Sequence, residues 1–148
     1  MRFRGWLALF FCGALCGVVL LFCGLLRNPC GRMAGGVETE REYYLYTPSS
    51  QAKIASRLSF ADYFSLVGEK YTLRFPSAEA ANTYVENLLI EKGAQTLFEE
   101  RVAGVRSIYA YTMDGREGAW LYGGRVNLHL VVCGDEVQVG TPIIFGGY

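Results

Sequence analysis

An uncharged run of twenty-one residues, from Trp6 to Leu26, constrains this chain more than any other feature. At ~1.5 Å of helical rise per residue, such a run spans roughly 31 Å, which is about the thickness of the hydrocarbon core of a bilayer. We therefore expect residues 1–27 to form a signal-anchor that crosses a membrane as a transmembrane helix.

A cleaved secretory signal is the alternative interpretation of this run. The apolar core of such a signal is ordinarily ~7–15 residues long, which is shorter than the run observed here. Ala34 and Gly36 offer small residues for a cut before Val37, but they lie eight or more residues beyond Leu26. An uncleaved anchor is favoured, and the N-terminal residue of the mature protein would separate the two readings.

The charges that flank the run predict its orientation. The free amine, Arg2 and Arg4 precede it, whereas Arg27 and Arg32 follow it. Because the more positive flank tends to stay in the cytoplasm, the N-terminus is predicted to lie inside. The remainder of the chain is then extracytoplasmic.

Small residues give the run a possible face for self-association. They fall on two neighbouring stripes of a helical wheel, and Gly13 and Gly17 have the spacing that lets two membrane helices approach closely. The stripes consist of Cys12, Cys16 and Cys23, and of Gly13, Gly17 and Gly24. A homodimer formed through this segment is one hypothesis, and a chance pattern is the other.

The net charge of the remaining chain limits the classes of partner that it can bind. Four of the fourteen Lys and Arg residues lie at or before Arg32, whereas all fourteen Asp and Glu residues follow it. The net charge of the soluble part is therefore near −4, which argues against nucleic acid and against anionic lipid headgroups as its partner.

The length of the remaining chain, about 116 residues, is enough for one domain. Cys133 is the single cysteine of that domain. A buried free thiol is expected there, and a disulfide bridge to Cys30 outside the cytoplasm is the alternative.

Hydrophobic periodicity predicts an α+β domain over residues 43–148, after a flexible linker over residues 28–42. The clearest helix begins at the N-cap Ser77 and ends at Lys92 and Gly93. Five to seven antiparallel strands are expected around it, with the helix packed on one face of the sheet.

The sequence also predicts individual turns and strands. Gly68 and Glu69 suit a hairpin turn between two short strands. The secondary structure of residues 51–62 is ambiguous, and a short helix is one interpretation. Ala103 and Gly104 suit a turn between strands at 94–102 and 105–113. Pro142 cannot donate to a ladder, so the last strand is expected at an edge or with a bulge.

Catalytic chemistry finds little support in the sequence. His129, the only histidine, alternates out of an apolar strand face and is expected to be a surface residue. Cys133 shares its face, but four residues of strand separate the two by ~13 Å, which excludes a nucleophile–base pair. No spacing of metal ligands or phosphate-loop pattern is present, so no catalytic residue, metal or cofactor is assigned.

Tyrosines supply the alternative to catalysis. Tyr109, Tyr111 and Tyr122 fall on expected strands, where exposed tyrosine offers rigid contact area with a hydrogen-bonding tip. They are candidate partner-binding residues, although tyrosine also simply suits strands. An envelope hydrolase or carbohydrate-modifying enzyme would instead need a cleft that gathers acids such as Glu99, Asp114 and Asp135.

The end of the chain resembles a known family. Val126-Asn127-Leu128-His129-Leu130 and Val139-Gly140-Thr141-Pro142-Ile143-Ile144 are similar to the close of the YwmB-like family. The segments Tyr84–Leu89 and Ser107–Tyr111 fit the same order. The resemblance covers at most Tyr43 to Tyr148. It implies a TATA-box-binding-like fold and an exported or membrane-anchored protein of endospore-forming Gram-positive bacteria. It implies no catalytic residues.

The expected function is therefore that of a membrane-anchored, extracytoplasmic domain that binds another envelope protein, with a link to sporulation suggested by the family. The fold label does not imply DNA binding, because the domain is acidic and fold alone does not carry function.

Overall fold

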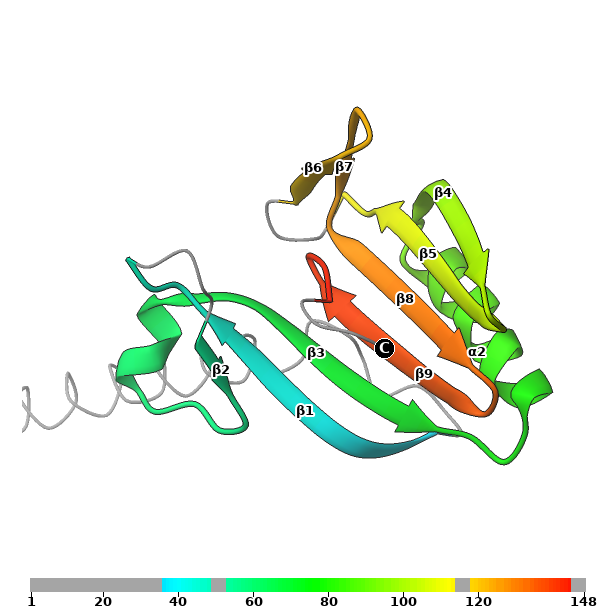
Figure 1. Cartoon of the computed structure of the whole chain (residues 1–148), viewed down its shortest axis with the longest axis horizontal. Coiled ribbons are helices and arrows are strands. Elements are labelled where there is room, and N and C mark those ends of the chain that lie inside the picture. The colour runs from blue at the N-terminus through cyan, green and yellow to red at the C-terminus, as the bar shows by residue number, and fades with distance from the viewer. Residues whose placement is uncertain (1–35, 49–52, 114–117, 145–148) are drawn as a thin grey trace, which may run out of the picture. The chain divides into compact units, whose positions relative to one another are not determined.

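The computed structural model describes residues 36–48, 53–113 and 118–144 (Figure 1). Two predicted features, the signal-anchor with its cysteine and glycine stripes and most of the linker, lie outside these residues. Within them, no helix is both long and apolar enough to cross a membrane. The elements in chain order are β1 (Val37–Leu45), β2 (Lys53–Ala55), η1 (Ala61–Phe64), β3 (Leu66–Arg74), α2 (Ala78–Glu91), β4 (Gln95–Val102), β5 (Val105–Tyr111), β6 (Ala119–Leu121), β7 (Gly124–Val126), β8 (Leu128–Cys133) and β9 (Glu136–Thr141).

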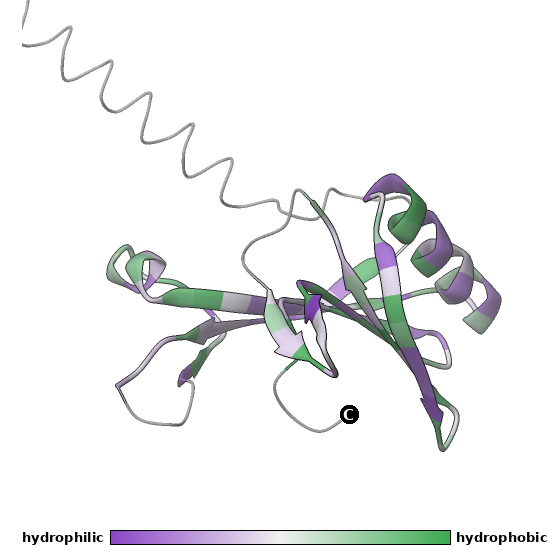
Figure 2. Cartoon of the chain, turned by 90° about the horizontal axis from the view of Figure 1, so that it is seen from above, coloured by the Kyte–Doolittle hydropathy of each residue, from purple (hydrophilic) through white to green (hydrophobic). Residues whose placement is uncertain are grey.

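Seven of the strands form one antiparallel sheet in the order β2-β1-β3-β9-β8-β5-β4, and β6 pairs with β7 in a separate ribbon. The helix α2 connects β3, near the middle of the sheet, to β4 at its edge. Figure 2 shows α2 on one side of the sheet only. The α+β class with a large antiparallel sheet and a helix on one face is confirmed.

The helix begins and ends as its sequence predicts. The Oγ of Ser77 accepts a hydrogen bond from the backbone N–H of Ala80 at 3.2 Å, which satisfies one of the unpaired donors of the first turn. Gly93 follows the last turn with a φ of 54°, a conformation that glycine adopts without the clash of a Cβ. These two residues fix the length of the helix.

The hydrophobic core lies between α2 and the sheet. Ile108, Leu130 and Val139 are register partners on β5, β8 and β9, and all three are fully buried. The helix contributes Val85 and Leu88 to the same layer. Because side chains alternate along a strand, the intervening residues point to the opposite side, which we call the helix-free face.

Gly68 is not in a turn, as the sequence predicted, but inside the continuous strand β3. A Cβ built on Gly68 would clash with the backbone oxygen of Thr141 and would lie 3.0 Å from Cδ of Pro142. The glycine is therefore required by the close approach of the end of β9, which a turn prediction from local sequence does not consider.

Two boundaries also differ from the predictions. Residues 37–42, assigned to the linker, form most of β1, whose partners on β3 run from Val37↔Arg74 to Leu45↔Leu66. The strand β9 is not an edge, because it lies between β3 and β8. Pro142 comes directly after its last residue, so no ladder hydrogen bond is lost. The ambiguous stretch before β3 holds β2 and the 3-10 turn η1.

Candidate interaction surface

Aromatic rings form a continuous row across the helix-free face. The rings of Phe98 and Tyr109 stack with centroids 4.2 Å apart, and those of Tyr109 and His129 stack at 4.1 Å. The register explains the row, because Phe98↔Tyr109 and Tyr109↔His129 are cross-strand partners on β4, β5 and β8. Such pairs stabilise a sheet through direct side-chain contact.

The β6–β7 ribbon extends this row by one more ring. Tyr122 stands at the tip of the ribbon, and its ring meets Phe98 edge-to-face with centroids 5.0 Å apart. We call the four residues Phe98, Tyr109, Tyr122 and His129 the aromatic row. Of the predicted tyrosines, Tyr109 and Tyr122 are thus brought together, whereas Tyr111 shares the strand and face of Tyr109.

The backbone of Tyr122 is strained. Tyr122 has a φ of 48° and Gly123 a φ of 82°, the pattern of a two-residue hairpin turn in which both central residues are left-handed. Asparagine or glycine ordinarily fills the first of these positions, and a bulky residue there is a genuine outlier. The side chain is nevertheless 85% exposed. The ribbon therefore holds a tyrosine in solvent at an energetic cost.

His129 closes the other end of the row and is not a surface residue, contrary to the prediction. It is only 1% exposed, and its Nδ1 accepts a hydrogen bond from the backbone N–H of Ile144 at 3.3 Å. Pro142–Ile144 turns back over this part of the helix-free face, which the strand pattern alone does not reveal. Burial lowers the pKa of His129 to about 4, so the ring is neutral at neutral pH.

Cys133 also differs from its prediction. The thiol is free and exposed, not buried, because it ends β8 at the margin of the sheet. His129 and Cys133 share a face of one strand, as expected, and the strand spacing keeps them too far apart for a catalytic pair.

The acids that an enzyme would need do not form a cleft among the described residues. Glu99 faces α2 and its carboxylate is held by two arginines, Arg106 and Arg101. The hydrogen bond from Arg106 lowers the pKa of Glu99, which keeps it ionised and makes it a poor proton donor. Asp135 lies in the turn after β8, and Asp114 lies outside the described residues. The same described part of the chain contains no group of three His, Cys, Asp or Glu suited to a metal.

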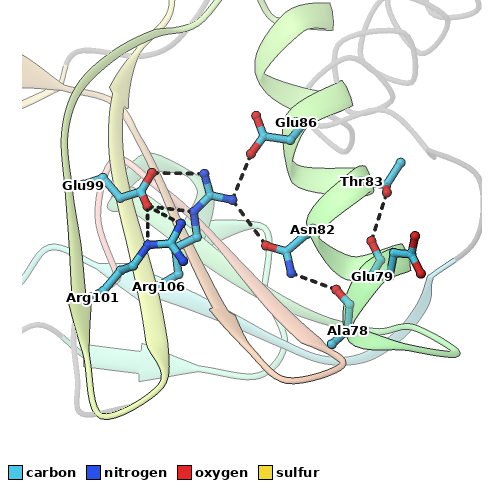
Figure 3. Close-up of polar contacts among 8 residues, drawn as sticks. All are labelled: Ala78, Glu79, Asn82, Thr83, Glu86, Glu99, Arg101 and Arg106. Atoms are coloured by element: carbon cyan, nitrogen blue, oxygen red, sulfur yellow. Dashed lines mark hydrogen bonds and ion pairs between the residues drawn. The ribbon is translucent and has the colours of Figure 1, made fainter.

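Arg106 is the centre of a polar cluster that joins the helix to the sheet (Figure 3). Its guanidinium donates to both carboxylate oxygens of Glu99 at 3.0 Å, to Oε1 of Glu86 at 2.9 Å and to Oδ1 of Asn82 at 3.3 Å. Glu86 and Asn82 belong to α2, whereas Glu99 belongs to the edge strand β4. The cluster therefore ties the strand that carries Phe98 to the helix on the other side of the sheet.

Replacing Arg106 with methionine is expected to lower the free energy of unfolding by about 1–2 kcal/mol, because several charge-assisted hydrogen bonds are lost from a largely buried guanidinium. The loss is expected to begin shrinking below about pH 4.5, the ordinary pKa of a glutamate in the unfolded chain, and to vanish only below the lowered pKa of folded Glu99. Amide hydrogen exchange of β4 and β5 in the full chain would measure it. Arg101→Met is the control, since the exposed Arg101 should contribute under about 0.5 kcal/mol.

Comparison with family models, with curated proteins and with solved structures finds no significant match to this chain. The functional argument therefore depends on the geometry of the aromatic row. Sequence reasoning identified Tyr109 and Tyr122 but missed Phe98 and His129. Phe98 was within reach, because the two-residue turn Ala103–Gly104 places it opposite Tyr109.

Proposed function

We propose that this chain is a membrane-anchored, extracytoplasmic domain of the bacterial envelope that binds another envelope protein through the aromatic row. The observation that carries the proposal is Tyr122, which is kept exposed in a strained backbone conformation with its ring packed on Phe98. Strain that a fold retains at an exposed position is typical of functional sites. The anchor and the location rest on the apolar run Trp6–Leu26.

The composition of the row suits protein recognition. Tyrosine and phenylalanine are rigid and lose little conformational entropy on binding, and such residues concentrate at the energetic centre of protein interfaces. The buried ring of His129 stacks on Tyr109. Because this histidine is neutral, the row carries no charge that a partner would have to desolvate. The resemblance to the YwmB-like family is the basis for proposing a role connected with sporulation.

Photo-crosslinking tests this proposal with the row intact. The full chain is produced in the organism from which it comes, with a photoreactive phenylalanine derivative in place of Leu97. Leu97 lies against the β6–β7 ribbon next to Gly124. A discrete adduct with one envelope protein is expected. Tyr122→Phe should preserve it, whereas Tyr122→Asn should reduce it at least about tenfold, as for a central interface residue.

Two controls make the result specific. Asparagine tolerates a positive φ better than tyrosine, so Tyr122→Asn should leave the domain folded and hydrogen exchange of β8 unchanged or slower. The same photoreactive residue at Ile90, exposed on α2, should give no matching adduct. An adduct at Leu97 that is indifferent to Tyr122→Asn, or no adduct at all, would contradict the proposal.

A further inference from the structure

A second exposed apolar surface lies in the loop between β2 and β3. We call residues 56–65 the η1 loop. Its two phenylalanines, Phe60 and Phe64, are 71% and 85% exposed, and their rings meet edge-to-face with centroids 5.9 Å apart. Neither ring contributes to the core, so packing inside this domain does not account for the pair.

The η1 loop holds these rings in a fixed arrangement. Oδ2 of Asp62 accepts hydrogen bonds from the backbone N–H and the Oγ of Ser59, at 2.8 and 2.6 Å. The backbone N–H and Oγ of Ser65 both donate to the carbonyl of Asp62 at 3.1 Å. Tyr46 N–H in turn donates to the carbonyl of Ser65 at 2.6 Å, which ties the loop to the end of β1. The rings are therefore preorganised before any partner arrives.

The η1 loop protrudes at one end of the sheet. The end of β1 and the start of β3 lie at this end, since Leu45 pairs with Leu66. The start of β8 and the end of β9 lie there too, and the β6–β7 ribbon with the exposed Trp120 projects from the same end (Figure 1). Aromatic tips thus stand at two separated points along one end of the sheet.

The charge of the loop differs from that of the whole domain. Lys53, beside the loop in β2, and Arg57 within it are both exposed, and Asp62 is the only acid of the segment 53–67. The carboxylate of Asp62 is engaged with Ser59. A net charge near −4 argues against an anionic surface for the domain as a whole, yet the segment 53–67 that carries the two phenylalanines has one more positive charge than negative.

We propose that the η1 loop docks on the surface of a lipid bilayer, with Phe60 and Phe64 entering the headgroup boundary and Lys53 and Arg57 facing anionic headgroups. Aromatic rings favour this boundary, and basic residues near it are attracted to anionic lipid. A bilayer can deform around a protruding tip and so accommodate both rings. The inference rests on the anchoring part of the proposed function and is independent of partner binding by the aromatic row.

The reach of the chain permits this docking. Residues 28–36 separate the expected anchor from β1, and nine residues span at most ~31 Å. The strand β1 has nine residues and is therefore about 30 Å long. The η1 loop lies at the end of β1, whereas Val37 lies at its start. A tethered domain that did not dock would hold the start of β1, not the η1 loop, closest to its point of attachment.

Lipid crosslinking tests the inference directly. The full chain, with a photoreactive phenylalanine derivative in place of Phe64, is reconstituted in vesicles of phosphatidylcholine and phosphatidylglycerol. Illumination is expected to give a lipid adduct, detected as a mass increase of one phospholipid. The adduct should fall in vesicles of phosphatidylcholine alone, and also in the Lys53→Gln, Arg57→Gln double variant.

The matched control is the same derivative at Val102. This residue is 70% exposed at the opposite end of the sheet, where β4 turns into β5, and Val37 lies at that end as well. Docking predicts more lipid adduct at position 64 than at 102, whereas simple tethering predicts the reverse order. Equal or reversed yields overturn the inference, as does an adduct at 64 with a second copy of the chain instead of lipid.

One further measurement separates this inference from the proposed function. Resistance of the unlabelled chain to extraction from the vesicles at alkaline pH reports whether the N-terminal segment anchors it. Loss of the lipid adduct with anchoring retained overturns only the docking of the η1 loop. Loss of anchoring instead contradicts the proposed function, together with the premise on which the docking depends.

Discussion

Replacing Asn127 with alanine is expected to lower the free energy of unfolding by about 3 kcal/mol, among the largest effects of any single polar substitution in this domain. The Oδ1 of Asn127 accepts a hydrogen bond from the backbone N–H of Thr112, and its Nδ2 donates to the carbonyl of Thr112, both at 2.7 Å. Both residues are buried. Alanine would leave the backbone donor and acceptor of Thr112 buried without these bonds.

The position of Asn127 explains why an amide is needed. The residue stands between β7 and β8, where the chain returns from the β6–β7 ribbon to the main sheet. Its own backbone N–H donates to the carbonyl of Ala110 at 3.1 Å. The side chain then acts as an additional backbone unit, supplying one donor and one acceptor to Thr112. The ribbon that carries Tyr122 is thereby attached to the end of β5.

Aspartate at this position is a sharper test of the same contact. A carboxylate can accept from the N–H of Thr112, but it has no donor for the carbonyl and would bury a charge. Asn127→Asp should therefore be at least as destabilising as Asn127→Ala at pH 7, and should recover part of that loss on acidification.

Amide hydrogen exchange of β8 in the full chain would measure both variants, because core amides of this kind exchange through global unfolding. Asn87→Ala, on the exposed side of α2, is the matched control and should change the free energy of unfolding by less than about 0.5 kcal/mol. A loss below about 1 kcal/mol for Asn127→Ala would show that water or another group replaces the amide.

Local sequence signals predicted the features that depend on local geometry. Ser77 and Gly93 defined the ends of α2, and the turn Ala103–Gly104 defined the β4–β5 hairpin, because capping and turn conformations are determined within a few residues. The alternation of Leu128, Leu130 and Val132 with His129 and Val131 also gave the correct faces of β8.

Contacts between distant segments were not available from the same signals. Gly68 appeared to be a turn residue because its neighbour, the end of β9, is more than seventy residues away in the sequence. His129 was expected at the surface because a polar residue opposite an apolar strand face usually meets solvent. The segment Pro142–Ile144 covers it, and the strand pattern does not encode that return.

In the candidate site, too, the sequence predicted some residues, whereas others depend on contacts between distant segments. The tyrosines were selected by residue type, which identified Tyr109 and Tyr122 but not the ring that joins them. Phe98 connects the two because a cross-strand register and a ribbon tip converge on it. The strained φ of Tyr122 carries the functional argument, and it becomes visible only once Tyr122 and Gly123 are known to occupy a two-residue turn.

Acidification from about pH 6.5 to about pH 4 is expected to destabilise the domain by about 3 kcal/mol through His129 alone. Burial lowers the pKa of His129 to about 4 in the folded state, whereas the unfolded chain has the ordinary value near 6.5. The unfolded state therefore binds the proton more tightly over this range. The stability that the neutral ring contributes is complete above the unfolded pKa and is lost as the pH falls toward the folded one.

The lone histidine makes this contribution measurable. No other histidine is present, so the imidazole resonances in an NMR spectrum of the full chain belong to His129. They are expected not to titrate between pH 8 and 5. The free energy of unfolding, from hydrogen exchange of β8, should decline over the interval from about 6.5 to about 4, with additional losses from Glu99 only below about 4.5.

Replacing His129 with glutamine distinguishes the contribution of the histidine to the pH dependence of stability from the contribution of the acids. The glutamine Oε1 can accept a hydrogen bond as Nδ1 does, but it does not titrate. His129→Gln should therefore flatten the pH dependence between about 6.5 and 4.5 and leave only the loss from the acids at lower pH. The same substitution removes the ring that stacks on Tyr109. A histidine that titrates near its ordinary pKa would show that Pro142–Ile144 does not seal this face in solution. The aromatic row would then extend to a charged ring in mild acid, and partner binding through Tyr122 would have to depend on pH over the same range.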